Sequence, residues 1–394
     1  MSRTEAEAEG HEATDAFRGE LRSWLAANFT GSVAASIRQP DRAAALRAHR
    51  EWNAALVDAG YGAIAWPAEY GGRDADILQQ LAYNEEMAAA RAPGPVNAIG
   101  VANIAPAIMA FGTSDQKQRF LRPMLRGDEL WSQGMSEPDS GSDLASLKCS
   151  AVRDGDDFVV NGQKTWNSNG DVADWCQLYV RTNADAPKHQ GITALLIDMT
   201  TPGVEARPIK TMAGEAGFSE LFFTDARVPA AALLGQVDAG WGVATNTLSH
   251  ERAGVASMYL SVRQQFEDLL QAACTPGEDG TRPIDSPVNR VALMRRFEET
   301  RNLEFLARRT LDAALSGQQP GAEGSVIKLA WSTTSQRLST TAVDVLGLSA
   351  LDGRWAASFL GSPSLTIAGG TTEIVKNIIG ERVLGLPREP KGAA

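Results

Sequence analysis

The chain has few of the residues that build disulfide frameworks or metal centres. Its 394 residues include three cysteines and four histidines, and no histidine stands at metal-ligand spacing from another. The cysteines, Cys149, Cys176 and Cys274, are far apart in the sequence. We therefore expect three reduced thiols in the cytoplasm rather than disulfides. We also expect no metal site, because zinc needs three or four clustered nitrogen or sulfur ligands.

The chain also lacks an excess of positive charge and any long apolar run. It has 48 acidic residues (Asp and Glu) against 37 basic ones (Lys and Arg), a net charge of −11. That balance argues against a nucleic-acid binder. No run of about 18 apolar residues is present, so we expect no membrane span, and the polar, acidic segment 1–10 predicts no secretion signal.

Patterns of apolar residues divide the chain into an N-terminal helical part, a β-rich part and a C-terminal helical part. Short β-rich runs, separated by Gly, Pro, Asn and Asp, predict strands at 147–153, 158–161, 175–181, 192–198, 204–209 and 220–228. Their spacing indicates an antiparallel barrel or sandwich. Helical periodicity predicts helices from Asp41 to about Gly60, at 75–91, 96–111, 116–126, 241–273, 288–316 and 325–346, and from about Thr371.

Three short motifs contain residues suited to a phosphorylated, planar ligand. Residues 136–143 combine hydroxyls with small residues whose backbone N–H groups can bind phosphate, although a solvated turn has the same composition. Trp166 could stack on a planar ring while Ser168 donates to it, although a core tryptophan at a strand end explains the pattern equally well. Gly369 and Thr371 open a helix, as an anion site or as an ordinary capped hinge.

With two further motifs, these segments resemble the acyl-CoA dehydrogenase family over nearly the whole chain. The five motifs stand in the family's order and spacing: Trp-Pro-Ala-Glu-Tyr-Gly-Gly at 66–72, Gly-Thr-x-x-Gln-Lys at 112–117, Ser-Glu-Pro-x-x-Gly-Ser-Asp at 136–143, Gly-x-Lys-x-Trp-x-Ser-Asn at 162–169, and Gly-Thr-x-Glu-Ile at 370–374. The resemblance implies an α+β protein of three domains: an N-terminal helical domain (1–130), a central antiparallel β-barrel or sandwich (131–236) and a C-terminal four-helix bundle (237–394).

The same resemblance implies bound FAD. Residues implied to lie along the flavin ring and its diphosphate are Met135, Ser136, Gly141 and Ser142. Trp166 would stack near the ring, Ser168 would bond its N5 region, and Thr371 and Glu373 would lie near the ribityl and phosphate groups.

The family's reaction removes a proton from Cα of a thioester and passes a hydride from Cβ to flavin N5. It needs a carboxylate base and hydrogen-bond donors on the thioester oxygen. Most members place the base directly before the C-terminal Gly-Thr, where this chain has Gly369. A minority carry it on the long C-terminal helix, where this chain has Glu251 followed by Arg252. We expect Glu251 as base, Arg252 as an orienting residue and the Gly369 N–H as donor, although by composition alone Glu251 reads as a solvated residue paired with Arg252.

One departure from the family bears on partners. Many members carry Arg-x-x-Phe-Gly about two dozen residues after the Glu-Arg position, and its Arg clamps the FAD of a neighbouring subunit. Here Arg263 and Phe266 come too early and lack the Gly, and the expected place holds a Pro/Gly-rich segment with Arg282. This resembles the catalytic chain of actinobacterial-type α2β2 heterotetramers, which often act on steroid side-chain thioesters. Alternatively, Arg282 replaces the clamp in a homodimer or homotetramer.

The resemblance implies dehydrogenation of an acyl-CoA to its trans-2-enoyl-CoA in fatty acid or steroid degradation, with an electron-transfer flavoprotein as acceptor. Three alternatives remain. A carrier-protein thioester could replace the CoA ester, because pantetheine is common to both. A flavin-dependent hydroxylase or oxidase on the same fold generally lacks the base, so Glu251 counts against it. A regulatory half without flavin is disfavoured by the intact motifs at 136–143 and 162–169.

Overall fold

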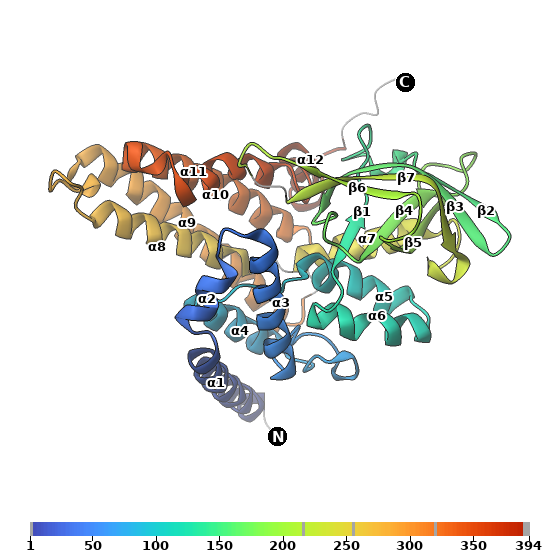
Figure 1. The fold of residues 1–394 in the computed structure, drawn as a ribbon. Coiled ribbons are helices and arrows are strands. Elements are labelled where there is room, and N and C mark those ends of the chain that lie inside the picture. The colour runs from blue at the N-terminus through green and yellow to red at the C-terminus, as the bar shows by residue number, and fades with distance from the viewer. Residues whose placement is uncertain (1–2, 215–216, 254–256, 319–320, 389–394) are drawn as a thin grey trace. The chain divides into compact units, whose positions relative to one another are not determined.

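The computed structural model describes residues 3–214, 217–253, 257–318 and 321–388, with side chains in the first helix described from residue 12 and those at 249–256 left out (Figure 1). The chain forms two compact units. One comprises Met1–Lys210 and Ala216–His250, and the other Thr211–Glu215 and Glu251–Ala394. We call them the β-containing unit and the helical unit. No helix in the described ranges is long and apolar enough to cross a membrane.

Helices at the start of the β-containing unit begin at side-chain caps. Asp41 accepts hydrogen bonds from the first backbone N–H groups of its helix, and Thr113 and Gln116 form a reciprocal capping box. The 112–117 motif is therefore a helix start. The helices are α1 (Arg3–Asn28), α2 (Gly31–Ile37), α3 (Arg42–Asp58), α4 (Ile77–Ala89), α5 (Ala105–Phe111) and α6 (Ser114–Arg126).

Eight strands form one sheet in the same unit, in the order β6-β7-β3-β2-β4-β5-β8, with β1 paired to β4. They are β1 (Trp131–Gly134), β2 (Ser150–Asp154), β3 (Asp157–Ser168), β4 (Trp175–Arg181), β5 (Ile192–Asp198), β6 (Val204–Ile209), β7 (Phe218–Pro229) and β8 (Leu233–Leu234). Most pairs are antiparallel, as predicted, but β1 runs parallel to β4. Neither β1 nor β8 was expected from the sequence.

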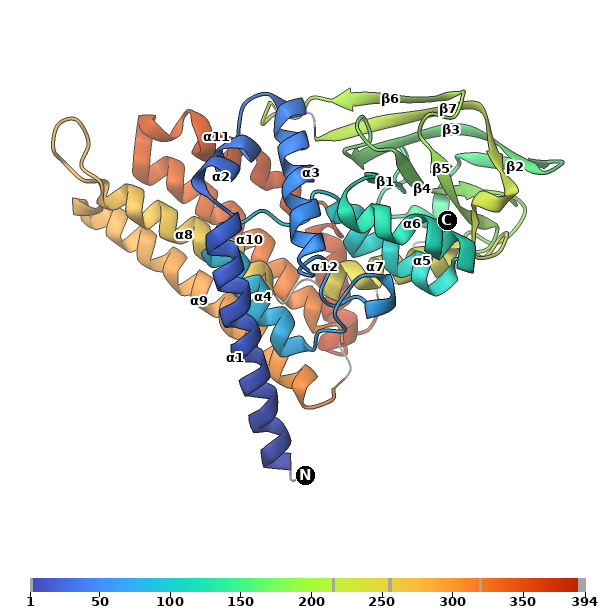
Figure 2. The same cartoon turned by 60° about the horizontal axis from the view of Figure 1, so that its bottom comes forward.

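The sheet has a hydrophobic cluster on each face. Phe158, Leu178 and Phe223, from β3, β4 and β7, belong to a cluster formed by strand residues and a few residues that flank the strands. On the opposite face Tyr179 belongs to a cluster with Ile108 of α5 and residues of α6, and these helices lie against the sheet in Figures 1 and 2. Burial on both faces explains why β4 and β5 are almost continuously apolar.

The helical unit consists mainly of α8 (Met258–Cys274), α9 (Pro287–Leu315) and α10 (Glu323–Leu346), which lie side by side (Figure 2). α11 (Gly353–Gly361) and α12 (Thr372–Ile378) follow, joined by the short 3₁₀ helix η8 (Ser362–Thr366). The helix predicted at 241–273 is two helices, α7 (Gly240–Ala253) and α8. α11 was not predicted.

Candidate functional site

The loop at 136–143 has a fixed backbone and an exposed tip. Glu137 and Ser140 exchange two backbone hydrogen bonds, of 2.8 and 3.1 Å, and the Ser140 hydroxyl donates to the Asp143 carbonyl at 2.7 Å. Gly141 and Ser142 are exposed at the tip, and a Cβ at Gly141 would meet nothing within 4 Å. The loop therefore offers backbone and hydroxyl groups to a ligand without having to reorganise.

A buried ion pair holds this loop to strand β3. The Lys164 ammonium is fully buried and donates to Glu137 Oε1 at 2.7 Å and to the Met135 carbonyl at 3.1 Å. The Glu137 carboxylate also accepts from the backbone N–H groups of Lys148 at 2.6 Å and Cys149 at 2.9 Å. Sequence reasoning assigned no role to Glu137 or Lys164, although two charged residues beside apolar strands were the available signal.

Trp166 lies on the same strand, and its side chain is exposed to solvent. It lies at a register shift of the β3–β7 pairing, has a left-handed φ of 60° and is 59% exposed. Its ring meets that of Phe218 edge-on, at 6.0 Å between centroids. The alternative of a core tryptophan is therefore wrong. A non-glycine residue held in the left-handed region at a bulge is a conformation that usually serves a function.

Backbone contacts place Trp166 beside the loop. The Thr165 N–H donates to the Ser136 carbonyl at 2.9 Å, so the half-buried Ser136 adjoins the residue before the exposed ring. Ser168, also half-buried, accepts at its carbonyl from the Ser132 hydroxyl at 3.0 Å. An open aromatic face beside serine hydroxyls and exposed backbone N–H groups suits a flavin with a diphosphate, so these residues fit FAD.

The glycine loop before α12 is in the helical unit. Gly369 and Gly370 have φ values of 66° and 97°, which glycine adopts without strain. Thr371 caps α12 by accepting from the Ile374 N–H at 3.3 Å. The ammonium of Lys328, a buried residue of α10, donates to the Gly370 carbonyl at 2.5 Å. Glu373, in the first turn of α12, is exposed.

The predicted base lies at the edge of what the structure describes. Glu251 and Arg252 fall in the last turn of α7, but their side chains lie outside the described residues. Their roles stay predictions. Met135, Ser136, Gly141, Ser142, Trp166 and Ser168 belong to the β-containing unit, and Glu251, Gly369, Thr371 and Glu373 belong to the helical unit.

Both arginines considered as FAD clamps have carboxylate neighbours of their own. Arg282 forms a two-pronged ion pair with Asp285, at 2.7 and 3.1 Å, and the hydrogen bond from Arg282 lowers the pKa of Asp285. Arg263 lies 3.7 Å from Glu267 on the same helix. Each would have to leave or share that neighbour to reach a diphosphate.

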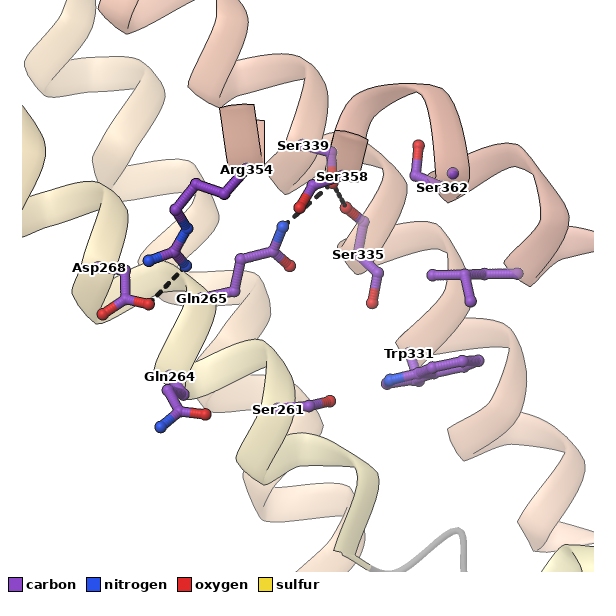
Figure 3. Close-up of a pocket in the computed structure, with 12 residues that line it drawn as sticks. Ser261, Gln264, Gln265, Asp268, Trp331, Ser335, Ser339, Arg354, Ser358 and Ser362 are labelled. Carbon is purple, nitrogen blue, oxygen red and sulfur yellow. Dashed lines mark hydrogen bonds and ion pairs between the residues drawn. The ribbon is translucent and has the colours of Figure 1, made fainter. Parts of the chain in front are cut away.

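The helical unit also contains an open cavity of about 410 Å³ that the sequence did not indicate (Figure 3). It lies between α8, α10, α11 and η8. Its walls are mostly serine and glutamine, with one Arg–Asp ion pair, one tryptophan and one leucine: Ser261, Gln264, Gln265, Asp268, Trp331, Ser335, Ser339, Arg354, Ser358, Gly361, Ser362 and Leu365. Gln265 donates to Ser339 at 3.2 Å, and Ser339 donates to the Ser335 carbonyl at 3.0 Å.

Known families and proteins match most of the chain. Three family models match: "Acyl-CoA dehydrogenase, N-terminal domain" at 11–128, "middle domain" at 132–226 and "C-terminal domain" at 238–384. The acyl-CoA dehydrogenase IpdE1 of Mycobacterium tuberculosis is 39% identical, over 95% of this chain and 98% of its own. The acyl-CoA dehydrogenase FadE26 of the same organism is 36% identical, over 94% and 96%.

Solved structures with the same fold include chains of two-protein complexes. A chain in the crystal structure of the ChsE4–ChsE5 complex from Mycobacterium tuberculosis has a TM-score of 0.81 and 35% identity, over 96% of this chain and 98% of its own. A chain of the complex described as the Tcur3481–Tcur3483 steroid ACAD has a TM-score of 0.81 and 27% identity, over 97% and 98%.

Proposed function

Because the chain belongs to the acyl-CoA dehydrogenase family, we propose that it oxidises an acyl-CoA thioester to the trans-2-enoyl-CoA with FAD as cofactor. The observation that carries this proposal is the exposed ring of Trp166, fixed beside the 136–143 loop by the Thr165–Ser136 hydrogen bond and the buried Lys164–Glu137 pair. A core residue or a solvated turn needs no such arrangement.

The proposed roles divide between holding the cofactor and moving the proton. Trp166 would stack on the flavin ring, and the loop and hydroxyl residues Met135, Ser136, Gly141, Ser142, Ser168, Thr371 and Glu373 would hold its ring edge and phosphates. When bound, FAD supplies the acceptor for the hydride. Glu251 would take the Cα proton, and Arg252 would orient the turn next to it.

Gly369 has a separate proposed role. Its N–H would donate to the thioester oxygen, where charge develops as the Cα proton leaves. The glycine also has no side chain to occupy space beside Cα, so a branched or ring-bearing acyl group fits better here than beside a Glu. The relative described as a steroid ACAD supports a bulky acyl group.

A substitution of the proposed base tests the mechanism. We expect Glu251→Gln to keep FAD and bind acyl-CoA but fail to bleach the flavin when substrate is added without oxygen, because the amide cannot accept the Cα proton. The matched control is Glu267→Gln, an exposed carboxylate on α8, which should bleach at the wild-type rate. Bleaching of Glu251→Gln at the wild-type rate would show that another residue is the base.

The partner is proposed from the same comparisons. We propose an α2β2 assembly with a second family chain that supplies the missing FAD clamp, since Arg282 is already paired with Asp285 and two of the solved relatives are complexes of two proteins. An electron-transfer flavoprotein would then reoxidise the cofactor. The native mass and FAD content of this chain purified alone decide the matter. One FAD per chain in a homo-oligomer would refute the unlike partner and make Arg282 the substitute clamp.

A further inference from the structure

Trp166 occupies a backbone position that is unfavourable for a residue with a side chain. The pairing of β3 with β7 places two residues, Thr165 and Trp166, opposite the single residue Glu220, which is a β-bulge. Trp166 has a positive φ of 60° there, where glycine is the usual residue. A conformation of this kind persists only when the surrounding structure enforces it, so contacts next to the bulge must hold Trp166 in place.

Both neighbours of Trp166 are tied to strand β1 and the residues just after it. On one side, the Thr165 N–H donates to the Ser136 carbonyl at 2.9 Å. On the other side, the Asn167 amide donates from its Nδ2 to the Gln133 carbonyl at 2.7 Å. The first bond uses only backbone groups, so any residue except proline would make it. The second bond depends on the side chain of Asn167.

The two residues that form this second bond are themselves well anchored. Gln133 lies beside Gln177 in the pairing of β1 with β4, and its side chain donates to that of Gln177 at 3.0 Å. Asn167 is 0% exposed, and Gly170 packs against it, since a Cβ at Gly170 would lie 3.3 Å from the Asn167 Cβ. The Asn167–Gln133 bond therefore fixes the distance between two anchored strands directly beside the bulge.

The other end of the Asn167 amide has no hydrogen-bond partner among the described residues. Its Oδ1 is buried and unpaired, and so is the hydroxyl of Ser219, which is also 0% exposed and lies directly opposite on β7. A buried polar atom without a partner costs stability, and an apolar side chain at position 167 would avoid that cost. Packing therefore does not call for an asparagine here, and we attribute its presence to the bond that its Nδ2 makes.

We propose that Asn167 is a positioning residue for the indole ring that stacks on the flavin. Its bond to Gln133 holds Trp166 at the positive φ, and this conformation sets the direction in which the exposed ring points. The inference rests on the proposed FAD-dependent function and adds to it a residue that acts through Trp166, because the Asn167 side chain is itself fully buried. Without the Nδ2 bond, the bulge relaxes toward ordinary backbone angles and the ring turns away from the cofactor.

The fluorescence lifetime of bound flavin tests the proposal, because a stacked indole quenches an excited flavin. In the holoenzyme, formed with its partner chain if FAD binding needs one, Asn167→Leu replaces the amide by an apolar group of similar size. We expect the FAD dissociation constant to rise about 3- to 10-fold, the worth of one neutral hydrogen bond. The lifetime of the flavin that stays bound should lengthen toward that of Trp166→Leu, which has no indole beside the ring. Asn167→Ala gives the same test if circular dichroism shows that leucine disturbs folding.

Ser219→Ala is the matched control. Ser219 is buried as completely as Asn167 and lies opposite it, but its hydroxyl has no hydrogen-bond partner among the described residues. The variant should therefore keep the wild-type dissociation constant and the wild-type lifetime. An equal change in Ser219→Ala and Asn167→Leu would show that any disturbance of this interior moves the flavin, and the positioning role of Asn167 would be refuted.

Further outcomes separate failure of this inference from failure of the proposed function. If Asn167→Leu lowers the urea midpoint but its bound flavin keeps the wild-type lifetime, or if it changes neither, Asn167 does not position the ring, and the dehydrogenase function still stands. If Trp166→Leu itself leaves the lifetime unchanged, or if the wild type binds no FAD even with a partner chain, the observation behind the proposed function fails and the inference fails with it.

Discussion

The buried Lys164–Glu137 pair lets burial be separated from ion pairing in a single experiment. Replacing Lys164 by Met keeps the length of the side chain but removes the charge. The Glu137 carboxylate, 7% exposed, is then left with two backbone donors, from Lys148 and Cys149. Removal of one partner from a buried pair costs about 3–5 kcal/mol of unfolding free energy. Because two of its three donors remain, we expect a loss near 3 kcal/mol, at the lower end of that range.

The chain provides a control, a solvent-exposed ion pair with nearly the same N···O distance. Lys188 donates to Asp143 at 2.8 Å, against 2.7 Å for the buried pair, but both side chains are more than half exposed. Exposed pairs contribute about 0–1 kcal/mol. Lys188→Met should therefore move the urea midpoint little, and Lys164→Met should lower it clearly at an unchanged slope.

Unfolding is followed by far-UV circular dichroism, and FAD retention gives a second readout. The Met135 carbonyl loses a donor in Lys164→Met, so the loop beside Trp166 should loosen and the variant should lose flavin on gel filtration more readily than Lys188→Met. Equal midpoints and equal flavin content in the two variants would refute the view that burial makes this pair structural.

Three further predictions follow from burial and from close backbone contact. Burial raises the pKa of Cys149 to about 11 and that of Cys176 to about 12. A thiol reagent at pH 8 should therefore modify the exposed Cys274 quickly and the two buried thiols only after unfolding. Rapid loss of all three thiols from the native protein would contradict this. Desolvation lowers the pKa of His49 in the folded protein below its ordinary value of 6.5. The unfolded chain therefore takes up the proton first, and the free energy of unfolding should decline as the pH falls through that value. His49→Gln should flatten that slope in urea titrations. Gly72→Ala should destabilise by at least about 1 kcal/mol in the same titrations, because its Cβ would collide with backbone.

Local signals in the sequence were enough for most of the fold. The helix beginning after Asp41 and the one beginning after Thr113 follow from their caps, and strands β4 and β5 have the predicted bounds. Strand β1 has no such signal. It is four residues long, follows a helix directly and takes its register from the parallel partner β4, which is a tertiary contact rather than a local preference.

The candidate site, too, was predictable from local sequence only in part. The motifs located the loop at 136–143 and Trp166, because glycines, hydroxyls and an aromatic residue at fixed spacing are visible in the sequence. The burial of Lys164 was not visible, since it depends on what packs around strand β3. Nor could periodicity reveal the cavity beside Ser335, because a helical pattern indicates which face is covered and not whether the covering leaves a void.

The tip of the hairpin between β6 and β7 limits how this protein can be cut or recombined. The segment beginning at Thr211 groups with the C-terminal helices, and Met212 lines a second cavity of about 540 Å³ together with Arg296, Phe359 and Leu360. A chimera joined at a single crossover after the last strand would therefore bring in foreign helices that meet the resident hairpin tip. Chimeras of this chain with a relative should carry the relative's 211–215 segment together with its helices, which requires three junctions instead of one.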